Sequence, residues 1–160
     1  VAEYTANLCS NVIGQYIFGA LAHESHEALR LWYRSQTLNY RSMMTTVCDG
    51  ITALLPGIIV SKPRASIYSV VDVRNIAPAS FNAHEFVMYS VRTGKVVVDG
   101  TAFTLLVSPM ADFYEHTPGG PNPGRTQMRI AYVDTPDRMA LVPRVLTGLF
   151  EEFRSPKKAI

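Results

Sequence analysis

Apolar residues recur along the chain in two different periods, and the change between them separates helices from strands. From the N-cap pair Ser10-Asn11, apolar positions follow helical spacing as far as Leu21. Ser25 caps a second predicted helix, which Pro56-Gly57 ends after roughly 30 residues. Its apolar and aromatic positions step by threes and fours: Leu29, Tyr33, Tyr40, Met43 or Met44, Val47, Ile51 and Leu54. The spacing predicts a packing face along one long helix.

Beyond this turn the pattern becomes that of strands. Residues 58–60 predict a short strand and residues 66–73 a buried one. A helix then begins at Asn82 and is closed by Gly94 as a left-handed cap. Residues 95–98 either end that unit or form a strand. Residues 101–107 predict a further strand that runs into Ser108-Pro109-Met110.

The last third of the chain contains a loop, a strand and a helix. Residues 117–124 are rich in Gly and Pro and predict a loop without regular structure. Residues 128–133 predict the last strand, after which Thr135 caps the final helix with Pro136 at its first position. That helix has one apolar face: Met139, Val142, Val145, Leu146, Leu149, Phe150 and Phe153. Residues 155–160 predict a frayed tail.

The order of these elements predicts the fold class. Two helices, strands, a helix, strands and a final helix indicate an α/β (α+β) two-layer sandwich. We expect a small sheet with helices mainly on one face, preceded by the long helix. A length of 160 residues fits a single domain spanning residues 1–160. Because the first residue is Val1, we expect the chain to be part of something longer, although a processed start is equally compatible.

Composition excludes several functional classes. A net charge of +2 with scattered basic residues is too small for a nucleic-acid surface. No uninterrupted run approaches the roughly 20 apolar residues of a membrane span. Cys9 and Cys48 are too few for a disulfide framework, so we expect reduced thiols in a cytoplasmic protein. His23 and His26 lack an apparent third ligand, and we expect no metal site.

Arg129 is the strongest candidate for chemistry. It lies at the head of the otherwise apolar strand, and together with Arg125 it brackets the exit of the Gly/Pro loop. A guanidinium can hold a carboxylate through two parallel hydrogen bonds. The plainer interpretation is an arginine at a strand end that pairs with a surface carboxylate.

Several segments together carry a resemblance to a known family. In chain order they are Leu8–Gln15, Leu38–Arg41, Lys62–Tyr68, Pro109–Tyr114 and Arg129-Ile130-Ala131-Tyr132-Val133. Their order resembles the C-terminal small domain of fold-type I pyridoxal-phosphate-dependent aminotransferases, class I/II. Ala65 and Asp112 stand where that family has glycine, so the backbone there approaches a substrate less closely.

The resemblance implies a function and a site. Arg129 would bind the α-carboxylate of the substrate and Tyr68 would line the pocket. The intact enzyme would bind pyridoxal 5'-phosphate, act as a homodimer, and transfer an amino group between an amino acid and a 2-oxo acid. Its Schiff-base lysine and phosphate ligands would lie in a large domain absent from this chain, so we expect no catalytic or cofactor-binding residue here. The four lysines support this, because none has the Ser-x-x-Lys setting of the family: Lys62, Lys95, Lys157 and Lys158.

Two alternatives remain open. One is a non-catalytic α/β module that binds a small carboxylate or a protein partner. The other is a pyridoxal-phosphate lyase or decarboxylase on the same scaffold, since any reaction on an amino acid can use a carboxylate-binding arginine.

Overall fold

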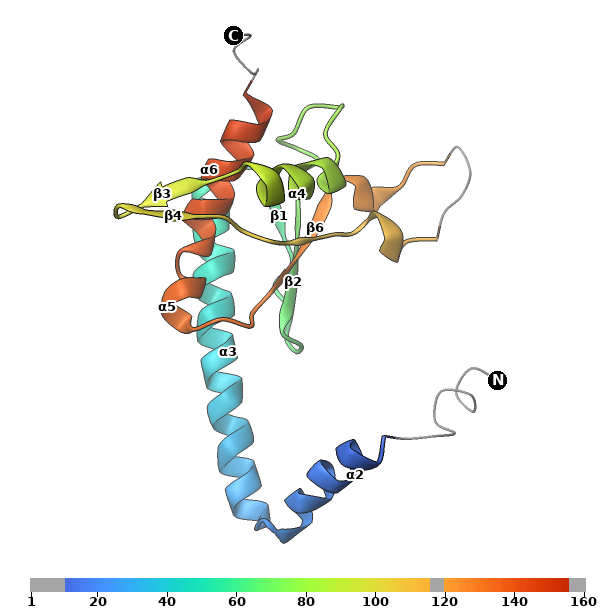
Figure 1. The fold of residues 1–160 in the computed structure, drawn as a ribbon, viewed down its shortest axis with the longest axis vertical. Helices are drawn as coiled ribbons and strands as arrows, with labels where there is room; N and C mark the ends of the chain where they lie inside the picture. The colour runs from blue at the N-terminus through green and yellow to red at the C-terminus, as the bar shows by residue number, and fades with distance from the viewer. Residues whose placement is uncertain (1–10, 116–119, 156–160) are drawn as a thin grey trace. The chain divides into compact units, whose positions relative to one another are not determined.

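A computed structural model describes residues 11–115 and 120–155 of the chain (Figure 1). The chain divides into two compact units, Val1–Asn39 and Tyr40–Ile160. The described part of the first unit contains helix α2 (Val12–Gly19), the 3-10 turn η1 (Ala20–His23) and the beginning of helix α3 (His26–Leu54). The rest of α3 and all later elements belong to the second unit.

Both N-caps predicted for the first unit form their capping hydrogen bonds in the structure. The Asn11 side chain accepts a hydrogen bond from the Gly14 backbone N–H at 2.9 Å, whereas Ser10 lies outside the described residues. The Ser25 hydroxyl accepts one from the Ala28 N–H at 3.1 Å and so starts α3, which is 29 residues long. These side chains satisfy amide groups that have no partner within the helix. The long helix predicted from the sequence is confirmed.

The second unit is built around a four-stranded antiparallel sheet with the order β1-β2-β6-β5. The strands are β1 (Ile59–Val60), β2 (Tyr68–Asp72), β5 (Ser108–Pro109) and β6 (Gln127–Ala131). The register of β2 and β6 places Val70 opposite Arg129 and Asp72 opposite Gln127. A separate hairpin pairs β3 (Val96–Val98) with β4 (Thr101–Phe103), and its turn residues Asp99 and Gly100 both have positive φ, as a tight hairpin requires.

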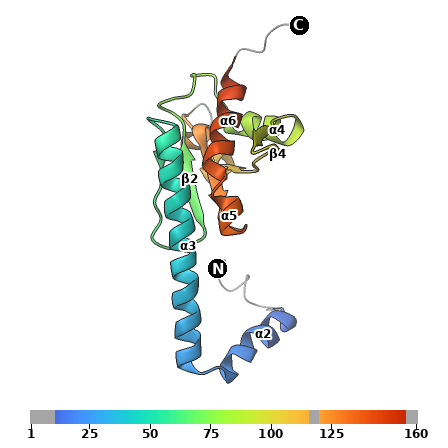
Figure 2. The same ribbon diagram turned by 90° about the vertical axis from the view of Figure 1, so that its left-hand side faces the viewer.

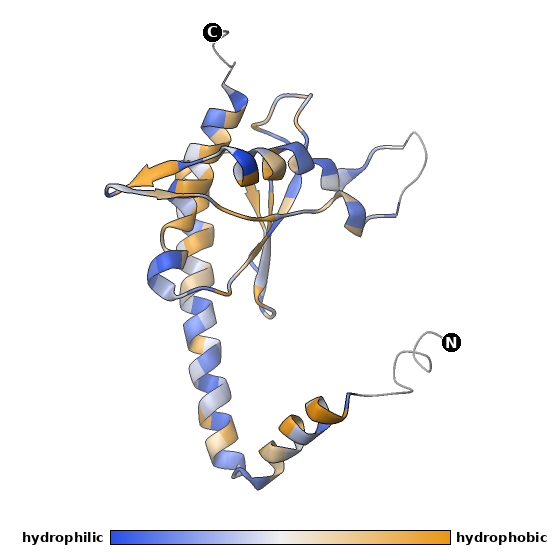
Figure 3. Ribbon diagram, in the orientation of Figure 1, coloured by the Kyte–Doolittle hydropathy of each residue, from blue (hydrophilic) through white to orange (hydrophobic). Residues whose placement is uncertain are grey.

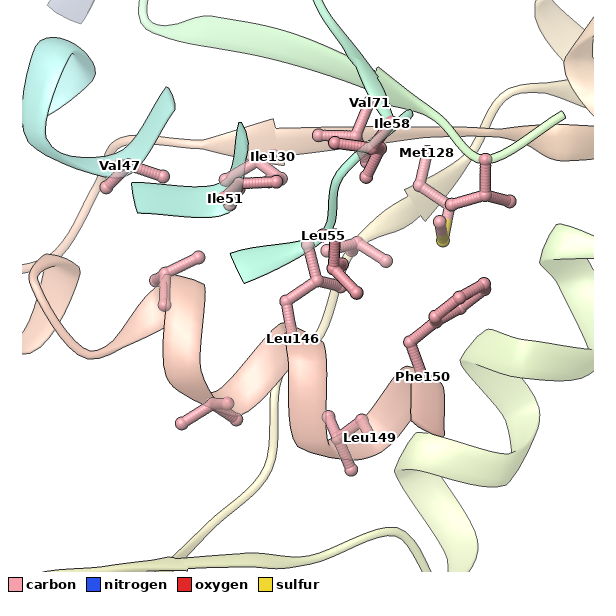
Figure 4. Packing of buried hydrophobic residues seen from close by; sticks show 14 of the residues in the cluster. Val47, Ile51, Leu55, Ile58, Val71, Met128, Ile130, Leu146, Leu149 and Phe150 are labelled. Atoms are coloured by element: carbon pink, nitrogen blue, oxygen red, sulfur yellow. The ribbon is translucent and has the colours of Figure 1, made fainter. Parts of the chain in front are cut away.

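Helices α3 and α6 (Val142–Arg154) cover one face of the sheet (Figure 2). Gly50 of α3 lies against the ring of Pro143, which brings the two helices into contact. The core lies between the two layers (Figure 4). It contains Val47 and Ile51 from α3, Leu55 directly after that helix, Val71, Met128 and Ile130 from the strands, and Leu146, Leu149 and Phe150 from α6. The two-layer sandwich with helices mainly on one face is confirmed.

Helix α4 (Ala83–Arg92) packs beside α6 through aromatic rings. Asn82 caps α4 as predicted, because its side chain accepts a hydrogen bond from the His84 N–H at 2.9 Å. Edge-to-face and tilted contacts at centroid distances of 5.4 to 6.4 Å join the rings: Phe81, Phe86, Tyr89, Phe150 and Phe153. Such pairs stabilise the packing beyond the area that they bury.

Two helix predictions were wrong. The final helix is not continuous from residue 136, because it forms α5 (Pro136–Met139) and then α6, with the break at Ala140-Leu141. Pro143 explains the break, because proline lacks an N–H and its ring would clash with the carbonyl four residues earlier in a continuous helix. Gly94 does not close α4 as a left-handed cap, since the positive-φ glycines of the described chain are Gly57 and Gly100. It is buried instead, and an added Cβ would lie 2.8 Å from Leu149 Cδ2.

The predictions for residues 101–107 and 117–124 were only partly right. Of the expected strand, only residues 101–103 form one, β4, and residues 104–107 are irregular. A second short strand, β5, begins at Ser108, and the two strands lie in different sheets. Between them, the Thr104 hydroxyl donates a hydrogen bond to the Ser90 carbonyl of α4 at 2.8 Å. The predicted loop ends in a short 3-10 helix, η3 (Pro123–Thr126), for which the Asn122 side chain accepts a hydrogen bond from the Gly124 N–H.

A buried carboxylate fixes the register of β2 against β6. Asp72 is 3% exposed, and its oxygens accept hydrogen bonds from Thr126 Oγ1 at 2.8 Å and Gln127 Nε2 at 3.0 Å. It also accepts from the Arg74 backbone N–H at 3.0 Å and pairs with the Arg74 guanidinium. Burial alone would raise the pKa of Asp72, but the hydrogen bonds from Arg74, Gln127 and Thr126 outweigh it and lower the pKa below the ordinary 3.8.

We expect Asp72→Asn to lower the free energy of unfolding by about 2–4 kcal/mol, because the buried side chain loses its charge and one of its two acceptor oxygens becomes an NH2 group that faces the donors of Arg74, Thr126 and Gln127. The measurement is urea denaturation at pH 7. In the unsubstituted protein, the stabilisation from Asp72 is complete above the unfolded-state pKa near 3.8 and is lost as the pH falls through the lower folded-state pKa. The control is the unsubstituted protein, measured at each pH beside the variant. Equal losses of stability for both proteins between about pH 5 and pH 2 would contradict this assignment.

We also expect Gly124→Ala to destabilise the second unit. A Cβ on this buried residue would lie 2.6 Å from the Ala111 backbone nitrogen and would also clash with the Met110 carbonyl group. Overpacking against backbone of this kind lowers the free energy of unfolding by about 1–3 kcal/mol. The control is Gly19→Ala, whose added Cβ meets no atom within 4 Å. Similar urea midpoints for the two variants would show that the contact is not close.

Candidate carboxylate-binding site

Arg129 occupies the middle of β6, on the face of the sheet that α3 and α6 leave uncovered. Side chains alternate along a strand, so burying Met128 and Ile130 in the core directs Arg129 to the opposite face. Val70 of β2 lies opposite it on one side and Ser108 of β5 on the other. The arginine is therefore held on a paired strand with a neighbour on each side.

Two aromatic rings contact the guanidinium. Arg129 Cζ lies 4.4 Å from the centroid of the Tyr68 ring and 4.7 Å from that of the Phe113 ring. Tyr68 is the first residue of β2, whereas Phe113 ends the short 3-10 helix η2 (Ala111–Phe113). Aromatic faces attract a guanidinium and restrict its movement without using its N–H groups. We call these three residues, Arg129, Tyr68 and Phe113, the Arg129 site.

The N–H groups of Arg129 are not engaged by the described residues. The ion pairs among those residues join Lys62 to Asp49, Arg74 to Asp72, Arg138 to Asp134 and Arg144 to Asp99. None involves Arg129, so the pairing with a surface carboxylate that the plainer interpretation requires is not found in this part of the chain. Arg125, by contrast, donates from Nε to the Phe81 carbonyl at 3.1 Å. A half-buried guanidinium that contacts two rings and has free donors is suited to binding an external carboxylate.

The Asp72 network extends to this site. The Tyr114 hydroxyl donates a hydrogen bond to Gln127 Oε1 at 2.5 Å, and the other end of the same amide donates to Asp72. Asn122 Nδ2 donates to the Ala111 carbonyl at 3.0 Å and holds the beginning of η2. Phe113 lies between these two attachments. Its ring is therefore positioned over Arg129 by polar contacts that begin at a buried carboxylate.

The structure brings together the two residues that the sequence singled out. Arg129 and Tyr68 are 61 positions apart in the chain, but the pairing of β2 with β6 brings the guanidinium into contact with the tyrosine ring. Phe113 was not predicted as part of the site. It belongs to the Pro109–Tyr114 segment that carried the family resemblance, and this was the available signal.

The described residues do not form a pyridoxal-phosphate site by themselves. Such a site needs a lysine amine to hold the cofactor and donors for its phosphate. The Lys62 ammonium pairs with Asp49 at 2.6 Å on the surface, and Lys95 is exposed after α4. Lys157 and Lys158 lie outside the described residues. What this part of the chain offers is the guanidinium of Arg129, which contacts two aromatic rings and has no ionic partner among the described residues.

Sequence comparisons give no relative. No protein-family model matches the chain, and no curated protein matches it.

Solved structures do match its fold. Kynurenine aminotransferase from Pyrococcus horikoshii, solved in complex with PMP, has a TM-score of 0.63 at 14% identity over 97% of this chain. Alpha-aminoadipate aminotransferase from Thermus thermophilus, solved with N-(5'-phosphopyridoxyl)-L-leucine, has a TM-score of 0.63 at 15% identity over 94%. An archaeal alanine:glyoxylate aminotransferase has a TM-score of 0.53 at 17% identity over 72%.

This chain spans only part of each matched structure. It covers 34% of the first two proteins and 24% of the third. The matched region is the C-terminal third, which contains the small domain with its long helix, small antiparallel sheet and final helix. The chain has the fold of the C-terminal small domain of fold-type I aminotransferases.

Proposed function

We propose that this chain is the small domain of a pyridoxal-phosphate-dependent aminotransferase, and that Arg129 binds the α-carboxylate of its substrate. The reaction exchanges an amino group between an amino acid and a 2-oxo acid in the cytoplasm. One observation carries the proposal: in a chain with this fold, the guanidinium of Arg129 contacts two rings and has no ionic partner among the described residues.

Arg129 acts by orienting the substrate. Two parallel hydrogen bonds from one guanidinium to one carboxylate fix the plane of that carboxylate and so the direction of the neighbouring Cα–H bond. Lysine would supply the charge without the planar pair of donors. The rings of Tyr68 and Phe113 keep the guanidinium from turning toward solvent and line the approach to it. Pyridoxal phosphate, held by residues outside this chain, would serve as the electron sink for the substrate.

The remaining parts of the active site belong to a large domain that this chain does not contain. That domain carries the lysine, the ring-nitrogen aspartate and the phosphate ligands, and residues 1–160 form one domain beside it. The intact enzyme is a homodimer. The lengths of the matched structures support this division, since this chain covers about a third of two of them.

A non-catalytic module that binds a small carboxylate is the second candidate. Its support is the position of the described lysines, because Lys62 is paired on the surface and Lys95 is exposed. This chain could then use the same Arg129 site without any cofactor. A lyase or decarboxylase would use the site in the same way, and assays of products separate it from a transaminase.

We expect the native polypeptide to be about three times as long as this chain, in keeping with the matched structures. The measurement is the intact mass of the protein purified from its own cell, together with the sequence that precedes Val1. A longer chain with a lysine in a Ser-x-x-Lys setting supports the aminotransferase. A native chain of 160 residues would contradict it and leave the carboxylate-binding module.

In the intact protein, we expect Arg129→Ala to reduce kcat/KM for amino-acid substrates by the equivalent of about 2–5 kcal/mol, the loss expected for a buried charge pair. Arg129→Lys should recover part of this loss, because it restores the charge without the two parallel donors. The control is Arg92→Ala at the exposed end of α4. Unchanged kcat/KM in Arg129→Ala would rule out carboxylate binding by this residue.

A further inference from the structure

Three buried polar side chains meet on the core side of the sheet, behind the Arg129 site. The hydroxyl of Tyr132, directly after β6, lies 2.8 Å from Ser69 Oγ on β2 and 3.4 Å from Cys48 Sγ on α3. We call these three residues, which are all at most 2% exposed, the Tyr132 cluster. The surrounding core is apolar, and orange residues mark it on α6 and on the adjoining part of α3 (Figure 3). A buried hydroxyl in such surroundings costs free energy unless it is hydrogen-bonded.

The hydrogen bonds of this cluster run in one direction. A carbonyl oxygen can only accept, so the Cys48 thiol donates to the Ser61 carbonyl at 3.7 Å. The Tyr132 hydroxyl then donates to the Cys48 sulfur and accepts from the Ser69 hydroxyl, which is the arrangement that gives all three hydrogens an acceptor. Burial raises the pKa of Tyr132, and so does the hydrogen bond to Cys48, so the phenol stays protonated and remains a donor.

Tyr132 holds the beginning of β2 on both sides of Tyr68. Ser69 points into the core, so the alternation of strand side chains directs its neighbour Tyr68 to the open face, where its ring contacts Arg129. The Tyr132 backbone N–H donates to the Ile67 carbonyl at 2.9 Å, just before the strand begins. One residue is therefore hydrogen-bonded to β2 through its main chain at residue 67 and through its side chain at residue 69.

The segment before β2 gives this end of the strand little other support. Residues 61–67 lie outside helices and strands, and Ser66 has a φ of +77°, in the left-handed region that non-glycine residues seldom adopt. Such a conformation persists only where neighbouring contacts hold it. The middle of β2 is held differently, because the Val70 N–H donates to Ser61 Oγ at 2.7 Å and the Val70 carbonyl accepts from the Ser61 N–H at 2.8 Å. The beginning of the strand therefore depends on the Tyr132 cluster more than its middle does.

We propose that Tyr132 is a positioning residue of the Arg129 site. Its buried hydroxyl holds Ser69 and thereby keeps the ring of Tyr68 against the guanidinium, 4.4 Å from Arg129 Cζ. A ring in this position restricts the guanidinium without occupying its donors. The consequence for a substrate carboxylate rests on the proposed function, whereas the contact between ring and guanidinium does not.

Packing alone is the other role that a buried tyrosine can have. A phenylalanine fills nearly the same volume, so Tyr132→Phe removes the hydroxyl and leaves the packing of the ring in place. The variant deprives the buried Ser69 hydroxyl of its acceptor. It therefore separates positioning through the hydrogen bond from packing.

The first measurement follows Arg129 itself, without substrate. The polypeptide that the gene encodes is prepared with isotope-labelled arginine, and the Arg129 Nε–Hε resonance is identified by its loss in Arg129→Lys. Protons above the face of an aromatic ring resonate upfield, so we expect Tyr132→Phe to move this resonance downfield as the Tyr68 ring moves away. Ser69→Ala should have the same effect. The matched control is Ser90→Ala, which removes a buried hydroxyl from α4 and should leave the resonance in place.

The second measurement is the kinetics of the same protein with the amino acid that it transaminates fastest. We expect Tyr132→Phe to raise KM by about three- to tenfold, the scale of one net hydrogen bond, and to change kcat by less than about twofold. In a Tyr68→Ala background, Tyr132→Phe should have no further effect on KM, because the ring through which it acts is absent. A role in stability alone would lower the urea midpoint and leave both the Arg129 resonance and KM unchanged.

A double variant separates stability from positioning. Adding Ser69→Ala to Tyr132→Phe removes the serine hydroxyl that the single variant leaves unpaired, so we expect part of the lost urea midpoint to return. The Arg129 resonance should stay at its displaced position, because the hydrogen bond that holds the beginning of β2 is still missing.

The Arg129 resonance distinguishes failure of this inference from failure of the proposed function. An unchanged resonance in folded Tyr132→Phe overturns the inference even if the protein transaminates. A full-sized effect of Tyr132→Phe on KM in the Tyr68→Ala background also overturns it, since Tyr132 would then act by another route. A displaced resonance in a protein without transaminase activity supports the positioning role and rejects the function. If Tyr132→Phe does not fold, Ser69→Ala decides by the same measurements, because it removes the same hydrogen bond from the side of the strand.

Discussion

The carboxylate of Asp72 is the contact on which the arrangement of the second unit depends. It is buried at the end of β2 and accepts hydrogen bonds from Arg74, Thr126 and Gln127, so it joins the end of β2 to a segment more than fifty positions later. Its bond to Gln127 holds the register in which Val70 faces Arg129. A slip of one residue would direct every side chain of β6 to the opposite face, burying Arg129 and exposing Met128 and Ile130.

The site and the core are two faces of one strand. The two-residue period of β6 places Met128 and Ile130 against the helices and Arg129 on the open side. A position on a paired strand holds an arginine more firmly than a loop would. The ring of Phe113 contacts Arg129 because the neighbouring residue, Tyr114, is held in place. Its hydroxyl is hydrogen-bonded to the Gln127 side chain, which is hydrogen-bonded in turn to Asp72. The polar network therefore supports both the fold and the side chains that surround the guanidinium.

The two units differ in how completely they bury their apolar residues. The second unit has a continuous core of α3, the strands, α4 and α6. In the first unit every residue of α2 is exposed. The match to aminotransferases at 14–17% identity shows that the fold persists with few identical residues. Burial pattern and strand register can persist when individual core residues change, because cores tolerate substitutions that keep volume and polarity.

The sequence by itself determined the caps at Asn11, Ser25 and Asn82, the long helix, the apolar face of α6 and the choice of Arg129 as the candidate site residue. These features depend on residues a few positions apart, whose periodicity and hydrogen bonding are local. Only the tertiary structure decided that residues 101–109 divide between two sheets, that Gly94 is needed for close packing against Leu149, and that Phe113 contacts Arg129. Each of these depends on which distant segments meet, and a single sequence records no such pairing.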